Sequence, residues 1–84
     1  MRIHLRFFAG IREQLGFSEE TLDLPDTVKT VGQLRRFLME QGAVWQEVLS
    51  YERPVRMACC FEMATEDTAL TEGCEVAFFP PVTG

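Results

Sequence analysis

The sequence ends in Glu75-Val-Ala-Phe-Phe-Pro-Pro-Val-Thr-Gly84, a short apolar stretch followed by two prolines. Residues 75–79 have the composition of a buried β-strand. Proline has no amide hydrogen and its ring fixes φ, so the two prolines end the strand and favour an extended exit from the domain. We therefore predict an extended tail over residues 80–84 that has no charged side chain and consists of Pro80, Pro81, Val82, Thr83 and Gly84.

The first eight residues predict a second apolar strand. Apolar residues alternate with polar ones from Met1 to Phe7, which is the pattern of a strand with one buried face. Phe8 then places an aromatic ring on the otherwise polar face. Because these two strands are the most apolar in the chain, we expect them to be central neighbours in the sheet. If they pair in parallel, Phe8 and Phe79 point outward, side by side at the root of the tail.

Residues 30–42 predict the main helix. Thr30 and Gln33 have the spacing of a capping box, and Gly42 is placed to end the helix. The predicted apolar stripe consists of Val31, Leu34, Phe37 and Leu38, and the residues expected in solvent are Arg35, Arg36 and Glu40.

Shorter elements surround this helix in the sequence. We expect a two-turn helix at 9–15, a strand at 18–24, a helical turn or irregular loop at 43–53, a strand at 55–61, its turn at 62–67 and a loop at 68–73. One main helix that buries its stripe on one face of a mixed sheet gives a two-layer α+β domain, a β-grasp arrangement. The length of 84 residues suits a single domain, 1–84, including the tail.

The composition indicates a soluble globular domain. Apolar residues make up 46% and charged residues 25% of the chain, and no stretch has the apolar length of a membrane span. The net charge of −5 argues against nucleic-acid binding, because the sequence has no basic patch to contact phosphates. No apolar segment of a secretion signal follows Met1, so we expect a cytoplasmic protein.

Three cysteines, Cys59, Cys60 and Cys74, do not have the number or spacing of a disulfide framework or a plant-type iron–sulfur cluster. No Lys, Arg or His stands beside them to lower a thiol pKa, so we expect small apolar residues and not a persulfide relay. One of the adjacent pair should face the core. His4, the single histidine, is expected at the surface. The sequence thus predicts no metal site.

Two stretches resemble a known family. Leu5-Arg-Phe-Phe-Ala-Gly-Ile-Arg-Glu-Gln-Leu-Gly16, and the tail preceded by Leu70-Thr-Glu-Gly73, are similar to the small subunits of molybdopterin synthase, which are ubiquitin-like β-grasp sulfur carriers. The resemblance implies that a ubiquitin-activating-type enzyme uses ATP to adenylate the terminal glycine, and that sulfur replaces the adenylate to give a thiocarboxylate. It also implies a heterotetramer in which the tail enters the large subunit and passes sulfur to cyclic pyranopterin monophosphate, in molybdenum cofactor biosynthesis. Such a subunit binds no cofactor and donates sulfur without a catalytic side chain of its own.

The same resemblance assigns the site residues. The family ends in Gly-Gly, so Gly84 bears the thiocarboxylate if it is terminal and is penultimate if a further glycine follows. A docking surface is inferred from the residues themselves, because adjacent exposed apolar side chains usually mark an interface. We expect it to consist of Phe8 and Phe79, extended by Met63, and to be shared by the large subunit and the activating enzyme. Two alternatives stay open. One is a thiamin-type or ubiquitin-like sulfur carrier or modifier with another acceptor, and the other is an interaction module without a reactive terminus.

Overall fold

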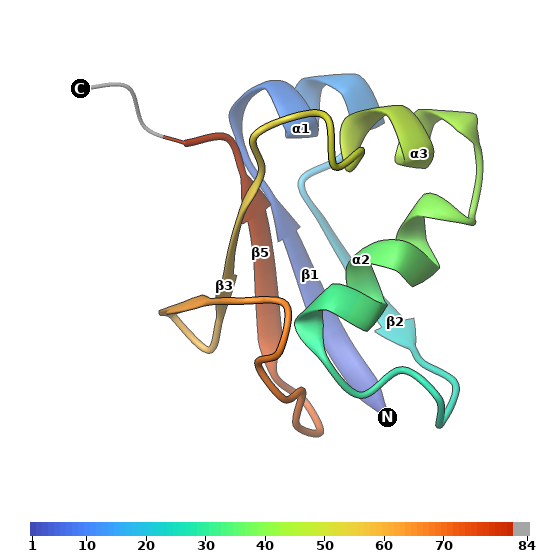
Figure 1. Ribbon diagram of the computed structural model, residues 1–84, viewed down its shortest axis with the longest axis vertical. Helices are drawn as coiled ribbons and strands as arrows, with labels where there is room; N and C mark the ends of the chain where they lie inside the picture. The colour runs from blue at the N-terminus through green and yellow to red at the C-terminus, as the bar shows by residue number, and fades with distance from the viewer. Residues whose placement is uncertain (82–84) are drawn as a thin grey trace.

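The computed structural model describes residues 1–81 as five strands and three helices (Figure 1). In chain order these are β1 (Arg2–Phe7), α1 (Ala9–Leu15), β2 (Glu19–Asp23), α2 (Val31–Met39), α3 (Ala43–Val48), β3 (Arg56–Cys59), β4 (Glu62–Ala64) and β5 (Glu75–Phe79). No helix within this part of the chain is long and apolar enough to cross a lipid bilayer.

The five strands form one mixed sheet in the order β2-β1-β5-β3-β4. β1 and β5 pair in parallel at its centre, with Leu5 opposite Val76 and Phe7 opposite Phe78, and the other neighbouring strands are antiparallel. The prediction that the first and last strands are central neighbours is confirmed, and they pair in parallel, which is the arrangement that turns Phe8 and Phe79 outward. The α+β fold with a mixed sheet is also confirmed.

The core lies between the sheet and the helices. Every second residue of the two central strands points into it, and the rings of Phe7 and Phe78 stack with centroids 6.1 Å apart. α2 contributes its predicted apolar stripe from the other side, because its capping box between Thr30 and Gln33 starts the helix in the predicted register. The fully buried residues in these three elements are Ile3, Leu5, Phe7, Val76, Phe78, Val31, Leu34 and Leu38.

The main helix ends earlier than predicted, and a further helix follows it. α2 stops at Met39 with Glu40 as its C-cap, whereas Gly42 precedes α3 as its N-cap. Segment 43–53 therefore contains a complete helix, α3, where a single turn or irregular loop was predicted. No clear apolar period marks this helix in the sequence, because it has six residues and Val48 is its one buried residue.

The strand predicted over 55–61 is present as β3 but ends at Cys59, and the prediction of a turn over 62–67 was wrong for residues 62–64. The chain reverses at Cys60-Phe61, and residues 62–64 form β4, which pairs antiparallel with β3. Cys60 and Phe61 have φ values of +52° and +69°, as a two-residue type I′ hairpin turn requires. Asparagine and glycine usually occupy such positions, so the Cys-Phe sequence carries no signal for the turn.

Arg35 was expected in solvent, and the structure buries it. Its side chain is 5% exposed, and its Nε and Nη2 donate hydrogen bonds to the carbonyl oxygens of Leu49 (2.8 Å) and Ser50 (2.9 Å). The guanidinium also lies 4.1 Å from the centroid of the Tyr51 ring. Burial lowers the pKa of Arg35 below its ordinary value, but the group stays charged at neutral pH. Through these hydrogen bonds Arg35 holds the segment after α3 against α2.

Replacing Arg35 by methionine is expected to lower the free energy of unfolding by about 2 to 4 kcal/mol, because two buried carbonyl groups lose charged hydrogen-bond donors. Urea denaturation measures the change. Arg36→Met is the matched control on the same helix, since its partly exposed ion pair with Glu66 contributes about 1 kcal/mol or less. Equal effects of the two substitutions would contradict this role for Arg35.

Candidate functional site

The predicted tail begins where β5 ends. Phe79 is the last residue of the strand, and Pro80 and Pro81 continue the chain outside the sheet (Figure 1). Two consecutive residues without amide hydrogens cannot extend the sheet ladder, which explains why the strand ends at this point. The predictions for Val82, Thr83 and Gly84 lie outside the described residues.

Two aromatic rings lie at the root of the tail. Since Phe7 and Phe78 are opposite each other and face the core, the next residues of the two parallel strands, Phe8 and Phe79, face the other side of the sheet. Their ring centroids are 6.5 Å apart with an interplanar angle of 84°, an edge-to-face contact. The Phe8 side chain is 40% exposed. The structure thus brings Phe8 and Phe79 together as an aromatic pair, in which Phe8 is exposed and Phe79 is half-buried.

Met63 shares this face of the sheet but lies away from the aromatic pair. It is 61% exposed on β4 and opposite Ala58 of β3, which in turn pairs with Ala77 of β5. Two strand spacings, about 10 Å, therefore separate Met63 from β5. Ala58 and Ala77 have small side chains, so an apolar strip runs from Met63 across the sheet to Phe79. Met63 was predicted to lie in a turn. It lies in strand β4 instead, and the pairing of this strand places it on this face of the sheet.

A charged group borders the aromatic pair. The Arg6 guanidinium lies 5.6 Å from the centroid of the Phe8 ring and forms ion pairs with Glu19 (3.7 Å) and Glu75 (3.6 Å). At these distances the buried Nε of Arg6 has no hydrogen-bond partner among the described residues. The surface therefore has an apolar centre and a charged border, which is the usual composition of a protein–protein interface.

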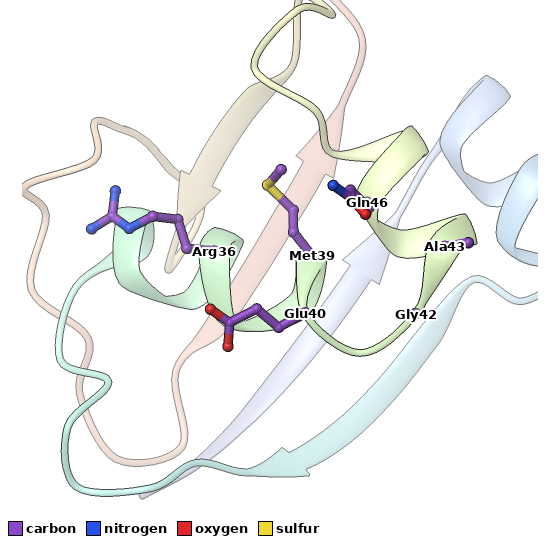
Figure 2. Close-up of a pocket in the computed structure, with 6 residues that line it drawn as sticks. All are labelled: Arg36, Met39, Glu40, Gly42, Ala43 and Gln46. Atoms are coloured by element: carbon purple, nitrogen blue, oxygen red, sulfur yellow. The ribbon is translucent and has the colours of Figure 1, made fainter.

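A second candidate is a hollow of about 550 Å³ between α2 and α3, but the side chains that line it are not arranged for catalysis (Figure 2). Figure 2 shows that the charged ends of Arg36 and Glu40 point in different directions. A nucleophile and a base within hydrogen-bond distance of each other are absent from its lining, which consists of Arg36, Met39, Glu40, Gly42, Ala43 and Gln46. The aromatic pair and the tail are therefore the stronger candidate.

The cysteines lie at the other end of β5 from the tail. Cys74 immediately precedes β5, and the strand's five residues span about 17 Å before the tail begins. Cys59 is buried and Cys60 is exposed, so the prediction that one of the pair faces the core is confirmed. Burial, together with the nearby Cys74, raises the pKa of the Cys59 thiol to about 12. At neutral pH Cys59 is therefore a protonated thiol and a poor nucleophile.

Near neutral pH we expect iodoacetamide to modify Cys60 at least about tenfold faster than Cys59, because thiolate fraction and exposure both control the rate. Since the pKa of Cys59 is raised, its rate should keep rising with pH up to about 12. Peptide mass spectrometry of briefly treated protein measures the order. The control is the unfolded chain in denaturant, where the two should react alike, and equal rates in the folded chain would contradict the burial of Cys59.

Known proteins are similar to nearly the whole sequence of this chain. The ThiS family matches residues 5–84. The chain is 38% identical over 84 residues to the molybdopterin synthase sulfur carrier subunit of Escherichia coli K12, and covers 98% of both sequences. It is 32% identical over 82 residues to the subunit of the same name from Haemophilus influenzae, again with 98% of each covered.

Solved structures show the same fold. The Haloferax volcanii HVO 2177 protein aligns with a TM-score of 0.78 and 29% identity, covering 100% of this chain and 86% of that one. A complex of subunits 1 and 2 of the molybdopterin-converting factor from Helicobacter pylori contains a chain that aligns with a TM-score of 0.69 and 22% identity, covering 100% and 99%. The chain therefore belongs to the ThiS family, with a ubiquitin-like β-grasp fold, and is a homologue of the sulfur carrier subunits of molybdopterin synthase.

Proposed function

We propose that this chain is the sulfur carrier subunit of a molybdopterin synthase, in molybdenum cofactor biosynthesis. The observation that carries the proposal is the similarity to two such carriers over nearly the full length of each protein. The family match reaches residue 84, so it includes the tail on which the chemistry depends. Both of these relatives are named for molybdopterin, which favours that acceptor over the thiamin-type alternative.

The chemistry explains why an accessible terminal carboxylate is needed. A carboxylate is a poor electrophile, because its charge is delocalised and its oxygen is a poor leaving group. Its attack on the α-phosphorus of ATP releases pyrophosphate and gives an acyl adenylate. Hydrosulfide from the sulfur donor then attacks the acyl carbon and displaces AMP with loss of one proton, so that the terminal group becomes a thiocarboxylate. A glycine at the terminus, either Gly84 or a further glycine after it, suits this role, since glycine has no Cβ and can pass through a narrow channel to a buried centre.

In this proposal the domain positions the tail and docks it. Phe8, Phe79 and Met63 form the surface that the large subunit and the activating enzyme share, and Pro80 and Pro81 keep the tail extended. The activating enzyme binds the ATP, so this chain needs no cofactor of its own. We place the protein in the cytoplasm, where ATP is available, as a member of a heterotetramer of small and large subunits.

The test is the intact mass of the full natural chain before and after incubation with ATP, the activating enzyme and a sulfur donor. The expected result is a mass increase equal to the difference between sulfur and oxygen, located on the terminal residue by fragmentation. A reaction without ATP is the control. Addition of the large subunit and cyclic pyranopterin monophosphate should then remove the sulfur. A chain that gains no sulfur would fit the non-reactive interaction module, and one that gains sulfur but does not transfer it would fit a carrier with another acceptor.

Replacing Pro80 and Pro81 by glycine should weaken binding to the large subunit about tenfold, because each flexible residue adds roughly 0.4 to 1 kcal/mol of chain entropy that is lost in the complex. Sulfur loading should still go to completion. Isothermal titration calorimetry measures the affinity, and Pro25→Gly, in the loop after β2, is the matched control. An unchanged affinity would show that the prolines do not preorganise the tail.

A further inference from the structure

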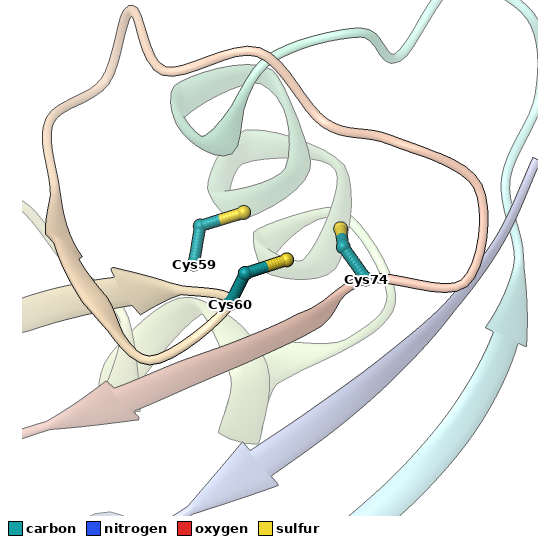
Figure 3. Close-up of side chains that lie close together, drawn as sticks. All are labelled: Cys59, Cys60 and Cys74. Carbon is teal, nitrogen blue, oxygen red and sulfur yellow. The ribbon is translucent and has the colours of Figure 1, made fainter.

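The three cysteines of the chain converge on one point. Their sulfur atoms all lie within 4.8 Å of one another, and Figure 3 shows the three side chains directed into a common space. Cys59 ends β3, Cys60 is in the turn to β4, and Cys74 precedes β5. The backbone of this region is paired, since the Cys60 amide donates to the Glu75 carbonyl oxygen at 2.8 Å and the His4 amide donates to that of Cys74 at 2.9 Å. The grouping therefore follows from sheet pairing and not from sequence spacing.

The backbone at this point is strained. Cys60 and Phe61 both have left-handed φ values, which cost free energy for residues with a Cβ atom. Phe61 gains no burial in return, because its side chain is 88% exposed. An Asn-Gly pair would form this turn without strain. The turn instead contains Cys60, whose thiol lies beside the two buried thiols. Strain of this kind is typical of functional positions.

The donor set selects a class of ligand. Three thiols, without a carboxylate or imidazole in the group, suit soft d10 ions such as Zn²⁺ or Cu⁺ and do not suit Mg²⁺ or Ca²⁺. Two sulfur atoms bound to one tetrahedral zinc at about 2.3 Å each are roughly 3.8 Å apart, so a closure of about 1 Å or less brings the sulfur atoms to that separation. Cys60 is exposed and provides access from solvent.

We propose that Cys59, Cys60 and Cys74 bind one thiophilic d10 metal ion, with Zn²⁺ held by three thiolates and a water at the fourth position. Binding involves no oxidation, because one Zn²⁺ replaces three thiol protons, which pass to solvent. The ion would link the turn between β3 and β4 to the start of β5, and so stabilise the edge of the sheet that contains Met63. This site lies at the far end of β5 from the tail and is independent of sulfur transfer.

The test is an anaerobic titration of the reduced, metal-free full chain with Zn²⁺ and, separately, with Cu⁺, each against a competing chromophoric chelator. We expect one ion per chain for at least one of these metals, and thiolate-to-metal absorption with Co²⁺ as the spectroscopic probe. Cys60→Ser should weaken binding at least tenfold, and because Cys60 is exposed this variant should keep its circular dichroism spectrum. Met63→Leu, which removes another sulfur atom from the same hairpin, should bind as the natural chain does.

The proposal is overturned if neither metal binds one-to-one, or if folded Cys60→Ser binds the metal with the affinity of the natural chain. Cys74→Ser provides a second readout from a different strand, and Co²⁺ absorption of unchanged intensity in that variant would also exclude a three-thiolate site. Because sulfur loading is not measured, the outcome is separate from that of the proposed function.

Discussion

Replacing Phe79 by aspartate should lower the affinity for the large subunit by roughly a hundredfold or more, while the domain stays folded. The Phe79 ring packs edge-to-face on Phe8 at the root of the tail, so in the complex we expect the pair to be desolvated. An unpaired carboxylate buried there costs about 3 kcal/mol or more. The fold should tolerate the change, because Phe78 and not Phe79 fills the core.

Co-elution on a sizing column and isothermal titration calorimetry measure this loss. Phe61→Asp is the matched control, since it introduces the same charge on a phenylalanine that is exposed at the other end of the sheet. Its affinity should stay within about twofold of the natural chain. Met63→Asp tests how far the interface extends across the apolar strip toward β4. Normal co-elution of Phe79→Asp with the large subunit would exclude the aromatic pair as the docking surface.

Much of the fold could be predicted because its signals are local. Alternation in residues 1–7 and the apolar run 75–79 identified the two central strands, and the spacing of Thr30 and Gln33 identified the start of α2. Two prolines after Phe79 likewise located the end of the last strand. Each of these features depends on residues that are neighbours in the sequence, so one sequence is sufficient to recognise them.

The features that were missed depend on contacts between distant segments. Arg35 is buried because carbonyl groups of residues 49 and 50, fourteen and fifteen positions later, accept its hydrogen bonds. The thiol of Cys74 meets those of Cys59 and Cys60 only through the pairing of β3 with β5. β4 was missed for another reason, because its turn uses residues that rarely adopt positive φ. Pairing and strain of this kind leave no pattern in the sequence.

A chain that ends at Pro81 should fold and dock but accept no sulfur. Within residues 1–81, all buried core residues lie between Ile3 and Phe78, so we expect the truncation to leave the core complete. The aromatic pair also remains, and we expect the affinity for the large subunit to fall by no more than about tenfold. The new terminal carboxylate, however, is about 10 Å short of the reach of residue 84 in an extended chain, and it belongs to a proline residue. Sulfur loading should therefore drop to the level seen without ATP.

Two further measurements distinguish the role of the tail's length in sulfur loading from the role of the aromatic pair in docking. A chain in which residues 82–84 are three glycines reaches as far as residue 84 without the side chains of Val82 and Thr83. It should load sulfur, because reach and lack of bulk are what the chemistry requires. The chain ending at Pro81, added in excess, should inhibit a reconstituted synthase by occupying the large subunit, whereas the same truncation combined with Phe79→Asp should not. Sulfur loading of the truncated chain, or a failure of the glycine-substituted tail to load, would contradict a tail that acts through reach alone. Inhibition by both truncated chains would instead show that the domain docks through a surface other than the aromatic pair.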